Sequence, residues 1–398
     1  KLRIGALLED LAELKVGDVV TFDGDEATPG DAGRMSVSWA GMSRALGPGA
    51  VLYLADGSVR LRVRSTRPDL HELDAEVEVG GAVASRQGLN IPGPVIELSA
   101  VPAEDLELLR LGELAGVDLV ALSFVRSPAD VEAVREHTRL PLIAKIEKPQ
   151  AVDCAEEILR AADCVMVARG DLGIELPIEE VPMVQKQLLK LAGELARPSI
   201  TATQMLDSMV ASSRPTRAEV ADVANAILDG TDAVMLSQET AVGNHPVGAI
   251  AMMAAIARHT ERYPDYQEWN ERRVRRDARD PAYTLAHSAC VAARELHLSA
   301  LIVPTLSGRS ARLVSAHRPE VPILALSPGR ETVRRCGLMW GVQAASIRRH
   351  HVTEELIADC ARRVVELGWC GPGDRVGITA GLPSGRPGST SLLQIQNL

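Results

Sequence analysis

One short segment places a lysine and a glutamate two residues apart at the end of an apolar run. The segment is residues 142–147, which includes Lys145 and Glu147. In a strand, residues two positions apart lie on the same face. A charged pair at the end of a buried strand is costly unless it holds a ligand or a metal ion, which makes this pair a candidate site. A structural salt bridge is the alternative interpretation.

Lysine is rare in this chain, which makes Lys145 informative. Of the 43 basic residues, six are lysines and 37 are arginines. The sequence therefore uses arginine wherever a general cation is enough. Lysine is the compact point charge that suits a phosphate group or an enolate oxygen.

The next apolar run ends in Gly170 and Asp171, with another glycine two residues later. Glycines on both sides of an acid allow close approach of the backbone, and the helical segment that follows would offer amides to an anion. Glu147 and Asp171 are predicted to come from adjacent strands, and two carboxylates with open positions suit Mg²⁺ or Mn²⁺. A turn followed by a helix cap explains the glycine and the acid separately, but not their pairing with Lys145.

Two further segments carry weaker signals. Thr201 and Thr203 place two hydroxyl groups at the period of a strand, although threonine favours strands in any case. Residues 214–219 contain Pro215 and Thr216, which mark a helix start that would cap a helix or hold a phosphate. A solvated surface loop is the commoner explanation of such a run.

The elements that must position these residues are short apolar runs separated by helical segments. Near-continuous Val, Ile and Leu runs suit parallel strands buried on both faces, and each run ends in polar residues. This pattern predicts an α/β fold, a (β/α)₈ TIM barrel with its site at the carboxyl ends of the strands. Only five such runs are present, so we expect an N-terminally incomplete barrel: Leu119–Phe124, Pro141–Glu147, Cys164–Arg169, Ser199–Gln204 and Ala233–Ser237.

The segments before and after these five runs show different sequence patterns. Residues 5–85 contain short alternating runs with Gly, Pro and Asp turns, which predict a small inserted β-barrel lid domain. Residues 1–4 are predicted to end a barrel strand, residues 86–260 to form barrel strands 4–8, and residues 261–282 to form a linker. Residues 283–398 predict a C-terminal open α/β domain, because apolar runs again alternate with helical segments.

Composition excludes several classes of protein. The 398 residues carry a net charge of −10, which argues against non-specific binding to nucleic acid. The longest nearly uncharged apolar stretch, residues 247–257, is too short to cross a membrane, so no membrane partner is expected. Six cysteines without a CxxC pair argue against structural zinc or a disulfide framework and are typical of a reducing cytoplasm.

Several motifs, taken together and in order, resemble the pyruvate kinase family. They are KIEKPQA at 145–151, MVARGDLGIELP at 166–177, ITATQMLDSM at 200–209, the run from Arg214 to Thr240, and GNHP at 243–246. SRQGLNIPG at 85–93 resembles the mobile β domain of the family, and residues 304–319 and 377–393 resemble its regulatory domain. The resemblance covers nearly the whole chain.

The resemblance implies a glycolytic enzyme that transfers a phosphoryl group from phosphoenolpyruvate to ADP, giving pyruvate and ATP. By the family motif, Glu147 and Asp171 would bind Mg²⁺ or Mn²⁺, and Lys145 would neutralise charge on the transferring group. Gly170, Asp171 and Thr203 would hold the substrate carboxylate, with Thr203 near the route of proton delivery. Arg3 matches a family arginine near the nucleotide phosphates. A cytoplasmic homotetramer is the family expectation for the full-length form.

Two departures bear on cofactors. The first barrel strands of the family, with residues that contact phosphate and K⁺, have no counterpart in this sequence. Lys1 falls where family members carry either Glu or Lys, and the Lys form accompanies independence from K⁺. The resemblance therefore implies that K⁺ is dispensable.

A loop in the C-terminal part resembles the family's phosphate-binding loop for sugar-phosphate effectors. Its hydroxyl groups and glycine suit an anion nest, although Leu306 stands where fructose-bisphosphate-sensitive members commonly have Lys. The candidate effector residues are Thr305, Ser307, Gly308, Arg309 and Ser310.

Two alternatives to a pyruvate kinase remain open at the level of sequence. A metal-dependent aldolase or lyase on the same barrel would also use Glu and Asp to hold a pyruvate enolate. A non-catalytic remnant that binds only a ligand or effector is the other. Because an incomplete barrel exposes strand edges, we expect the chain alone to fold poorly or to aggregate, and a sharp cooperative melt of a soluble species would contradict this.

Overall fold

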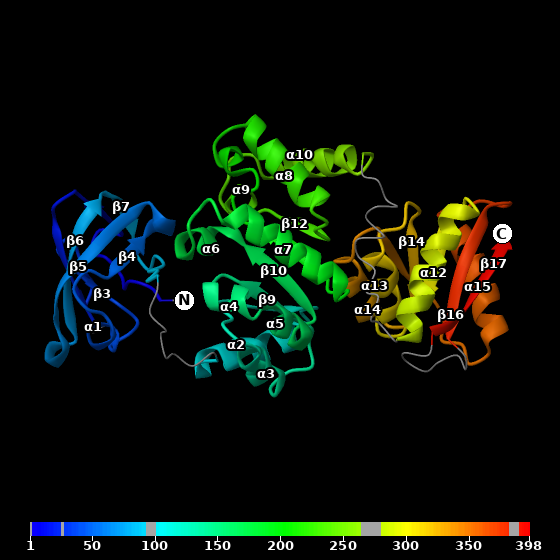
Figure 1. Cartoon of the computed structure of the whole chain (residues 1–398), viewed down its shortest axis with the longest axis horizontal. Helices are drawn as coiled ribbons and strands as arrows, with labels where there is room; N and C mark the ends of the chain where they lie inside the picture. Colours follow the sequence, from blue (N-terminus) through cyan, green and yellow to red (C-terminus); the bar gives the residue numbers. More distant parts are fainter. Residues whose placement is uncertain (1, 25–27, 93–100, 264–279, 382–389) are drawn as a thin grey trace.

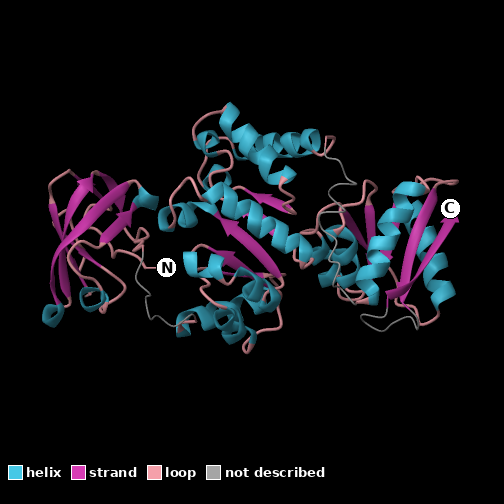
Figure 2. Ribbon diagram, viewed as in Figure 1, coloured by secondary structure: helices cyan, strands magenta, loops and turns pink. Residues whose placement is uncertain are grey.

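The computed structural model describes residues 2–24, 28–92, 101–263, 280–381 and 390–398. Three units follow one another along the chain and stand in a row in Figure 1: a β-rich unit, a central α/β unit and a C-terminal α/β unit. Figure 2 shows that strands dominate the first unit, whereas helices surround the sheets of the other two. None of the described helices is long and apolar enough to cross a membrane.

The β-rich unit consists of a five-stranded sheet and a two-stranded sheet. The five-stranded sheet has the order β3-β2-β6-β5-β4, and β1 pairs with β7. Alternation explains its core, because Leu73, Ala75 and Val77 of β6 point inward and their neighbours point outward. The elements are β1 (Leu11–Leu14), β2 (Val19–Asp23), β3 (Arg34–Ser36), α1 (Met42–Ala45), β4 (Val51–Leu54), η1 (Ala55–Gly57), β5 (Val59–Arg67), η2 (Pro68–Leu70), β6 (Glu72–Val79) and β7 (Gly81–Ala84).

The first described residues belong to this unit and not to the parallel sheet. Ile4 forms a bridge with Val37 and Arg3 forms one with Gly88. Leu2 and Ile4 are buried in the core of the β unit. The sequence predicts the end of a barrel strand at residues 1–4, and this assignment stays a prediction. Residue 1 lies outside the described residues, and the other domain boundaries stay a prediction.

The central unit is a parallel sheet of five strands in the order β12-β11-β10-β9-β8. All five residues of β10 are buried, as expected for a central parallel strand covered on both faces. The elements are α2 (Ala103–Ala115), β8 (Val120–Leu122), α3 (Pro128–Arg135), β9 (Leu142–Ile146), α4 (Pro149–Asp153), α5 (Ala155–Ala161), β10 (Cys164–Ala168), α6 (Arg169–Glu175), α7 (Val181–Glu194), β11 (Ser199–Ala202), η3 (Asp207–Val210), α8 (Arg217–Leu228), β12 (Ala233–Met235), α9 (Gln238–Ala241) and α10 (Pro246–Thr260).

The five predicted strands are all present, and each coincides with an observed strand within a few residues. They are neighbours in sequence order, the arrangement that successive βα units give in a barrel. The α/β barrel-type fold predicted from the sequence is therefore confirmed. Thr216 caps α8 through a reciprocal pair of hydrogen bonds with Glu219, so this threonine serves the helix.

The C-terminal unit is a second sheet, with the order β15-β14-β13-β16-β17, covered by helices on both faces. One core joins α12 and α13 to the sheet, and another joins α15 to its opposite face. The last strand runs antiparallel to β16. The elements are α12 (Pro281–Glu295), β13 (Ala300–Pro304), α13 (Arg309–Ala316), β14 (Ile323–Ser327), α14 (Arg330–Cys336), β15 (Val342–Ser346), α15 (Thr353–Glu366), β16 (Arg375–Gly381) and β17 (Thr390–Asn397). The predicted linker lies mostly outside the described residues.

Candidate active site

The carboxyl ends of three neighbouring strands bring the predicted residues together. Strand β10 lies between β9 and β11, with Met166 opposite Lys145 and Ala168 opposite Ala202. Because these strands are parallel, the residues that follow them meet at one edge of the sheet. Lys145, Glu147, Gly170, Asp171 and Thr203 form a cluster there, which we call the strand-end cluster.

Lys145 is held between an acid and a hydroxyl group. Its Nζ lies 2.6 Å from Glu147 Oε1 and donates a hydrogen bond of 2.9 Å to Ser123 Oγ. The Lys145 side chain is 22% exposed whereas that of Glu147 is fully buried. The ammonium group therefore lies at the boundary between the buried acid and the open end of the sheet, where it can approach an anionic substrate.

Glu147 is a carboxylate with an unusual environment. The Phe124 N–H donates a hydrogen bond of 2.6 Å to Oε2, and Phe124 has the left-handed φ of 56°. Burial raises the pKa of Glu147, and the nearby charge of Asp171 raises it further, while Lys145 and the Phe124 amide oppose the shift. Because burial disfavours the charged form of this carboxylate, a further cation beside it would stabilise that form.

Asp171 lies in the first turn of α6, next to Glu147 and close to the β-rich unit. Asn90 Nδ2 is 3.5 Å from Asp171 Oδ1, so the β-rich unit reaches the cluster through this amide. Glu147 and Asp171 fit a divalent metal that keeps water or substrate oxygens in its shell. A buried Glu147 Oε1 that receives no well-aligned hydrogen bond from the described residues supports this fit. No group of three or more His, Cys, Asp or Glu suited to a metal occurs in the described part of the chain.

Thr203 follows β11 in a conformation that is rare outside glycine. Its φ is 72°, and that of Gln204 is 53°. The Gly170 N–H donates to Thr203 Oγ1 at 2.7 Å, and Oγ1 donates to the Ala202 carbonyl at 2.6 Å. Left-handed conformations of such residues cost energy and concentrate at functional sites. The hydroxyl group is therefore held firmly at the cluster. The Gly170 amide, which is expected to bind substrate, already donates a hydrogen bond to it.

Three residues that the sequence did not single out as site residues support the cluster. Ser123 contacts Lys145, and Asn90 contacts Asp171. Arg169 donates to the Thr203 carbonyl at 2.9 Å and forms an ion pair of 2.7 Å with Asp222. All three lie within or beside segments that were recognisable in the sequence, but a pattern in sequence does not show which neighbour a side chain contacts.

Arg3 does not join the strand-end cluster in the structure. It is exposed in the β-rich unit, where its Nη1 donates to the Arg86 carbonyl at 3.0 Å. In the described part of the chain its side chain and N–H bond to Arg86 and Ser38 of the same unit, and not to Lys145 or Asp171. Its assignment to the nucleotide phosphates stays a prediction.

The candidate effector loop connects β13 to α13. Gly308 has a φ of 84° and its N–H donates to Thr305 Oγ1 at 3.0 Å. Arg309 forms an ion pair with Asp280, and Ser310 Oγ lies 2.7 Å from Thr390 Oγ1. The loop is therefore compact, and part of its hydrogen-bonding capacity is used within the protein. Binding of an effector phosphate here stays a prediction.

The burial of Glu147 leads to a testable prediction about metal binding. Since burial raises its pKa, the folded chain holds a proton on Glu147 at pH values above 4.5 where an exposed glutamate has lost it. A metal ion must displace that proton, so the affinity for Mn²⁺ is expected to rise with pH above 4.5. Glu147→Gln is expected to lower the affinity by at least about tenfold and to flatten the pH dependence.

Titration with Mn²⁺ at several pH values, followed by electron paramagnetic resonance, measures this effect. Glu180→Gln, an exposed acid at the start of α7, is the control with the same change in charge. Equal affinities for the two variants would remove Glu147 from the metal site.

Comparison with known proteins agrees with the geometry. The model of the family described as "Pyruvate kinase, barrel domain" matches residues 1–250, and that of "Pyruvate kinase, alpha/beta domain" matches residues 283–396. The curated pyruvate kinase of Clostridium acetobutylicum is 36% identical, over 100% of this chain and 85% of its own length. That of Geobacillus stearothermophilus is 39% identical, over 96% of this chain and 66% of its own length.

A solved structure gives the same result. The crystal structure of a pyruvate kinase from Cryptosporidium parvum superposes with a TM-score of 0.88 at 30% identity, covering 100% of this chain and 82% of that one. The family models together cover both α/β units and the β-rich unit. The motifs around Lys145, Asp171 and Thr203 all lie within the matched residues. The chain therefore belongs to the pyruvate kinase family.

Proposed function

We propose that the strand-end cluster is where this member of the family transfers a phosphoryl group from phosphoenolpyruvate to ADP, giving pyruvate and ATP. The observation that carries the proposal is the Lys145–Glu147 pair at 2.6 Å, beside Asp171, at the carboxyl ends of parallel strands. Phosphoryl transfer needs positioning and electrostatic stabilisation more than covalent chemistry. A cation, two carboxylates and a fixed hydroxyl group are the parts that such a reaction requires.

Each residue of the cluster has a proposed role. Lys145 stabilises negative charge on the transferring phosphoryl group and on the enolate oxygen. Gly170, Asp171 and Thr203 orient the substrate carboxylate, and the Thr203 hydroxyl lies on the route by which the enolate receives its proton. Arg3 contacts the nucleotide phosphates when the β-rich unit approaches the sheet.

Glu147 and Asp171 would hold Mg²⁺ or Mn²⁺. When bound, the metal supplies Lewis-acid stabilisation of phosphoryl and enolate oxygens. The two carboxylates position that ion, and burial of Glu147 lowers the competition from water for its oxygens. Lys145, whose Nζ lies 2.6 Å from Glu147 Oε1, would share the neutralisation of charge with that ion.

The direct test is formation of pyruvate from phosphoenolpyruvate and ADP with Mg²⁺, coupled to oxidation of NADH by lactate dehydrogenase. We expect turnover that depends on both substrates and on the metal. Cleavage of an oxo-acid without ADP, in place of this reaction, would favour an aldolase or lyase. Binding of phosphoenolpyruvate without turnover would favour the non-catalytic alternative.

Lys1 leads to a prediction about K⁺. Residue 1 lies outside the described residues, so the proposal rests on the resemblance, in which an ammonium group replaces the monovalent cation. We expect activity in K⁺-free buffer to differ less than about twofold from that in KCl, because the charge is already supplied. Lys1→Glu is expected to make activity depend on K⁺. Activity of the unchanged chain that strictly requires K⁺ would contradict the proposal.

The loop at residues 305–310 is proposed to bind the phosphate of a sugar-phosphate effector. We expect one of a panel of sugar phosphates to lower the KM for phosphoenolpyruvate, and Ser307→Ala to weaken that response. Ser288→Ala, an exposed hydroxyl on α12, is the control. No response to any sugar phosphate would remove the idea.

Assembly and location are also proposals. We propose that the full-length form is a homotetramer, with support from the family resemblance, and sedimentation measures this. We further propose a cytoplasmic location, supported by six free thiols of which five are buried. Fractionation of the source cells tests the location.

A further inference from the structure

The central and C-terminal units line a pocket at the opposite end of the parallel sheet from the strand-end cluster. Pro198 directly precedes β11 and Asp232 directly precedes β12, so the pocket lies at the amino ends of these strands. Its walls border about 210 Å³ of empty space that includes open solvent, so it is a shallow recess and not an enclosed cavity. One wall is formed by the residues that end and follow α7, and the other by α13 together with Met339. We call it the seam pocket.

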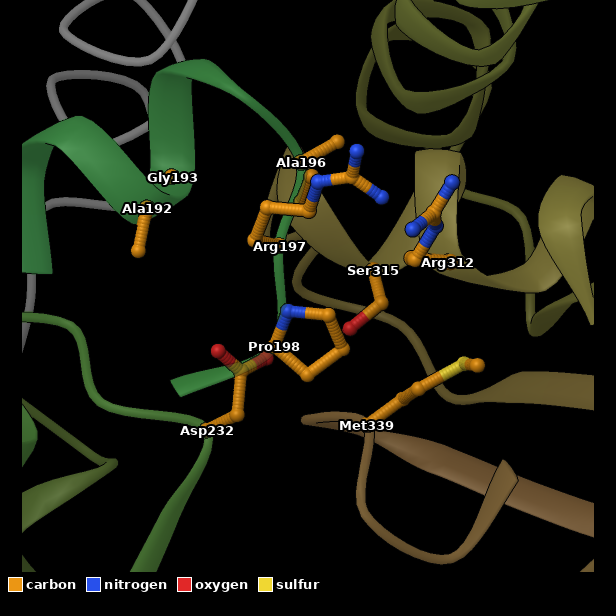
Figure 3. A pocket seen from close by; sticks show the side chains of 10 residues that line it. Ala192, Gly193, Ala196, Arg197, Pro198, Asp232, Arg312, Ser315 and Met339 are labelled. Carbon is orange, nitrogen blue, oxygen red and sulfur yellow. The ribbon is translucent and has the colours of Figure 1, made fainter. Parts of the chain in front are cut away.

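Two arginines from different units meet in the seam pocket. Figure 3 shows the guanidinium groups of Arg197 and Arg312 close to each other, on opposite walls. Arg197 is anchored, because its Nε donates to the Leu159 carbonyl at 2.9 Å and its Nη2 to the Arg160 carbonyl at 3.0 Å. Small residues line the wall next to it, which leaves room beside the guanidinium groups: Ala192, Gly193 and Ala196.

Arg312 has no anionic partner among the residues that the structure describes. Its Nε is buried and donates no hydrogen bond to any described residue. Burial, followed by the charge of Arg197, lowers the pKa of Arg312 to about 10. Burial likewise lowers the pKa of Arg197. Two partly buried cations that face each other are unfavourable unless an anion lies between them.

The acids near the seam pocket are engaged by other groups. Asp232 Oδ1 lies 2.8 Å from Arg318 Nη1, and its Oδ2 accepts from Ser199. Asp163 pairs with Arg135 and accepts from the Leu142 amide at 3.0 Å. Asp163 attracts both arginines over a distance, but neither carboxylate forms an ion pair with them in the described structure. Positive charge is therefore left in contact with the pocket.

We propose that the seam pocket binds an oxyanion, either inorganic phosphate or the phosphate group of a small monoester, between Arg197 and Arg312. Planar guanidinium groups are well suited to phosphate, because each presents two parallel N–H donors. The bound anion would replace repulsion between the two cations by attraction to both. It would also link the central unit to the C-terminal unit, since each supplies one arginine. This site is distinct from the strand-end cluster and from the loop at residues 305–310.

Isothermal titration with inorganic phosphate, in chloride buffer without Mg²⁺, tests the site. We expect saturable binding to the unchanged chain and an affinity at least about tenfold lower for Arg312→Gln, because a charge-assisted pair of hydrogen bonds is lost. Arg330→Gln, which removes an exposed arginine of α14, is the control with the same change in charge. Ser307→Ala is expected to keep the binding that Arg312→Gln loses, which separates the seam pocket from the effector loop.

Melting temperatures give a second readout. Without phosphate, Arg312→Gln is expected to melt at or above the temperature of the unchanged chain, because a repulsion has been removed. With phosphate, the unchanged chain and the two controls are expected to gain more stability than Arg312→Gln, in which any gain comes from the other phosphate-binding groups. If Arg312→Gln does not fold, Arg197→Gln tests the same pair from the other wall.

The nature of the ligand is decided by a parallel titration with glycerol 3-phosphate. Tighter binding than inorganic phosphate, lost in Arg312→Gln, would identify a monoester as the ligand; the reverse order would identify free phosphate. Absence of binding by either probe, or equal binding by Arg312→Gln and Arg330→Gln, would overturn the proposal.

Discussion

Lys145→Ala is expected to lower kcat for ATP formation by about 10³-fold. The ammonium group lies 2.6 Å from Glu147 Oε1 and is 22% exposed at the open end of the sheet, the position from which it reaches a substrate oxygen. Removing one preorganised charge that stabilises a transition state typically costs 10²–10³-fold or more in kcat. Since the effect is on chemistry, the KM for phosphoenolpyruvate is expected to change much less than kcat.

The measurement is steady-state kinetics with both substrates varied. Lys190→Ala is the matched control, because that lysine is on α7 with a side chain 72% exposed and lies outside the cluster. Lys145 also lowers the pKa of Glu147, so its removal weakens metal binding at low pH. Repeating the assay at higher pH and saturating Mg²⁺ separates this effect from the loss of the charge. Turnover within tenfold of the unchanged chain would exclude Lys145 from the reaction.

Arg318→Met is expected to lower the free energy of unfolding by about 3–5 kcal/mol. Arg318 is fully buried where the C-terminal unit meets the central unit. Its Nη1 pairs with Asp232 at 2.8 Å, and its Nη2 donates to the Gly230 carbonyl at 2.7 Å. The guanidinium carbon also lies 5.0 Å from the centre of the Trp340 ring. Removing one member of a buried pair leaves the other charge without compensation, and breaking such pairs typically costs this much.

Urea denaturation followed by circular dichroism measures the loss. Arg334→Met is the matched control, because Arg334 joins the same two units through Asp118 at 2.9 Å but its side chain is 50% exposed. Exposed pairs contribute little, so the control is expected to unfold close to the unchanged chain. The double variant Arg318→Met with Asp232→Asn is expected to recover part of the stability, because no buried charge is left unpaired. Equal losses in Arg318→Met and Arg334→Met would contradict the assignment.

Much of the fold follows from local patterns in the sequence. Continuous apolar runs locate the five parallel strands, and alternation locates β6 and its neighbours in the β-rich unit. These signals are local, because the period of a strand and the flanking turn residues are properties of a few consecutive residues. The antiparallel direction of β17 and the placement of residues 2–4 are decided by pairing over long distances in the chain.

The strand-end cluster likewise has features that local sequence patterns predict and features that depend on the fold. Apolar runs in the sequence predict that Lys145, Glu147, Asp171 and Thr203 lie at the ends of neighbouring parallel strands, and parallel strands bring those ends to one edge. Which atoms meet at that edge depends on the folded path of the chain. The Phe124 amide on Glu147 and the left-handed backbone at Thr203 depend on the exact path of the chain after each strand.

The contact between the two α/β units shows most clearly which features sequence patterns cannot predict. Arg197, Arg312 and Arg318 look alike in a sequence with 37 arginines. Tertiary packing buries Arg318 against an acid and brings Arg197 and Arg312 together without one. The sequence determined the strands, their order and the chemistry at their ends, because those depend on local periodicity. The structure decided which charges are paired and which are not, because pairing depends on residues far apart in the chain.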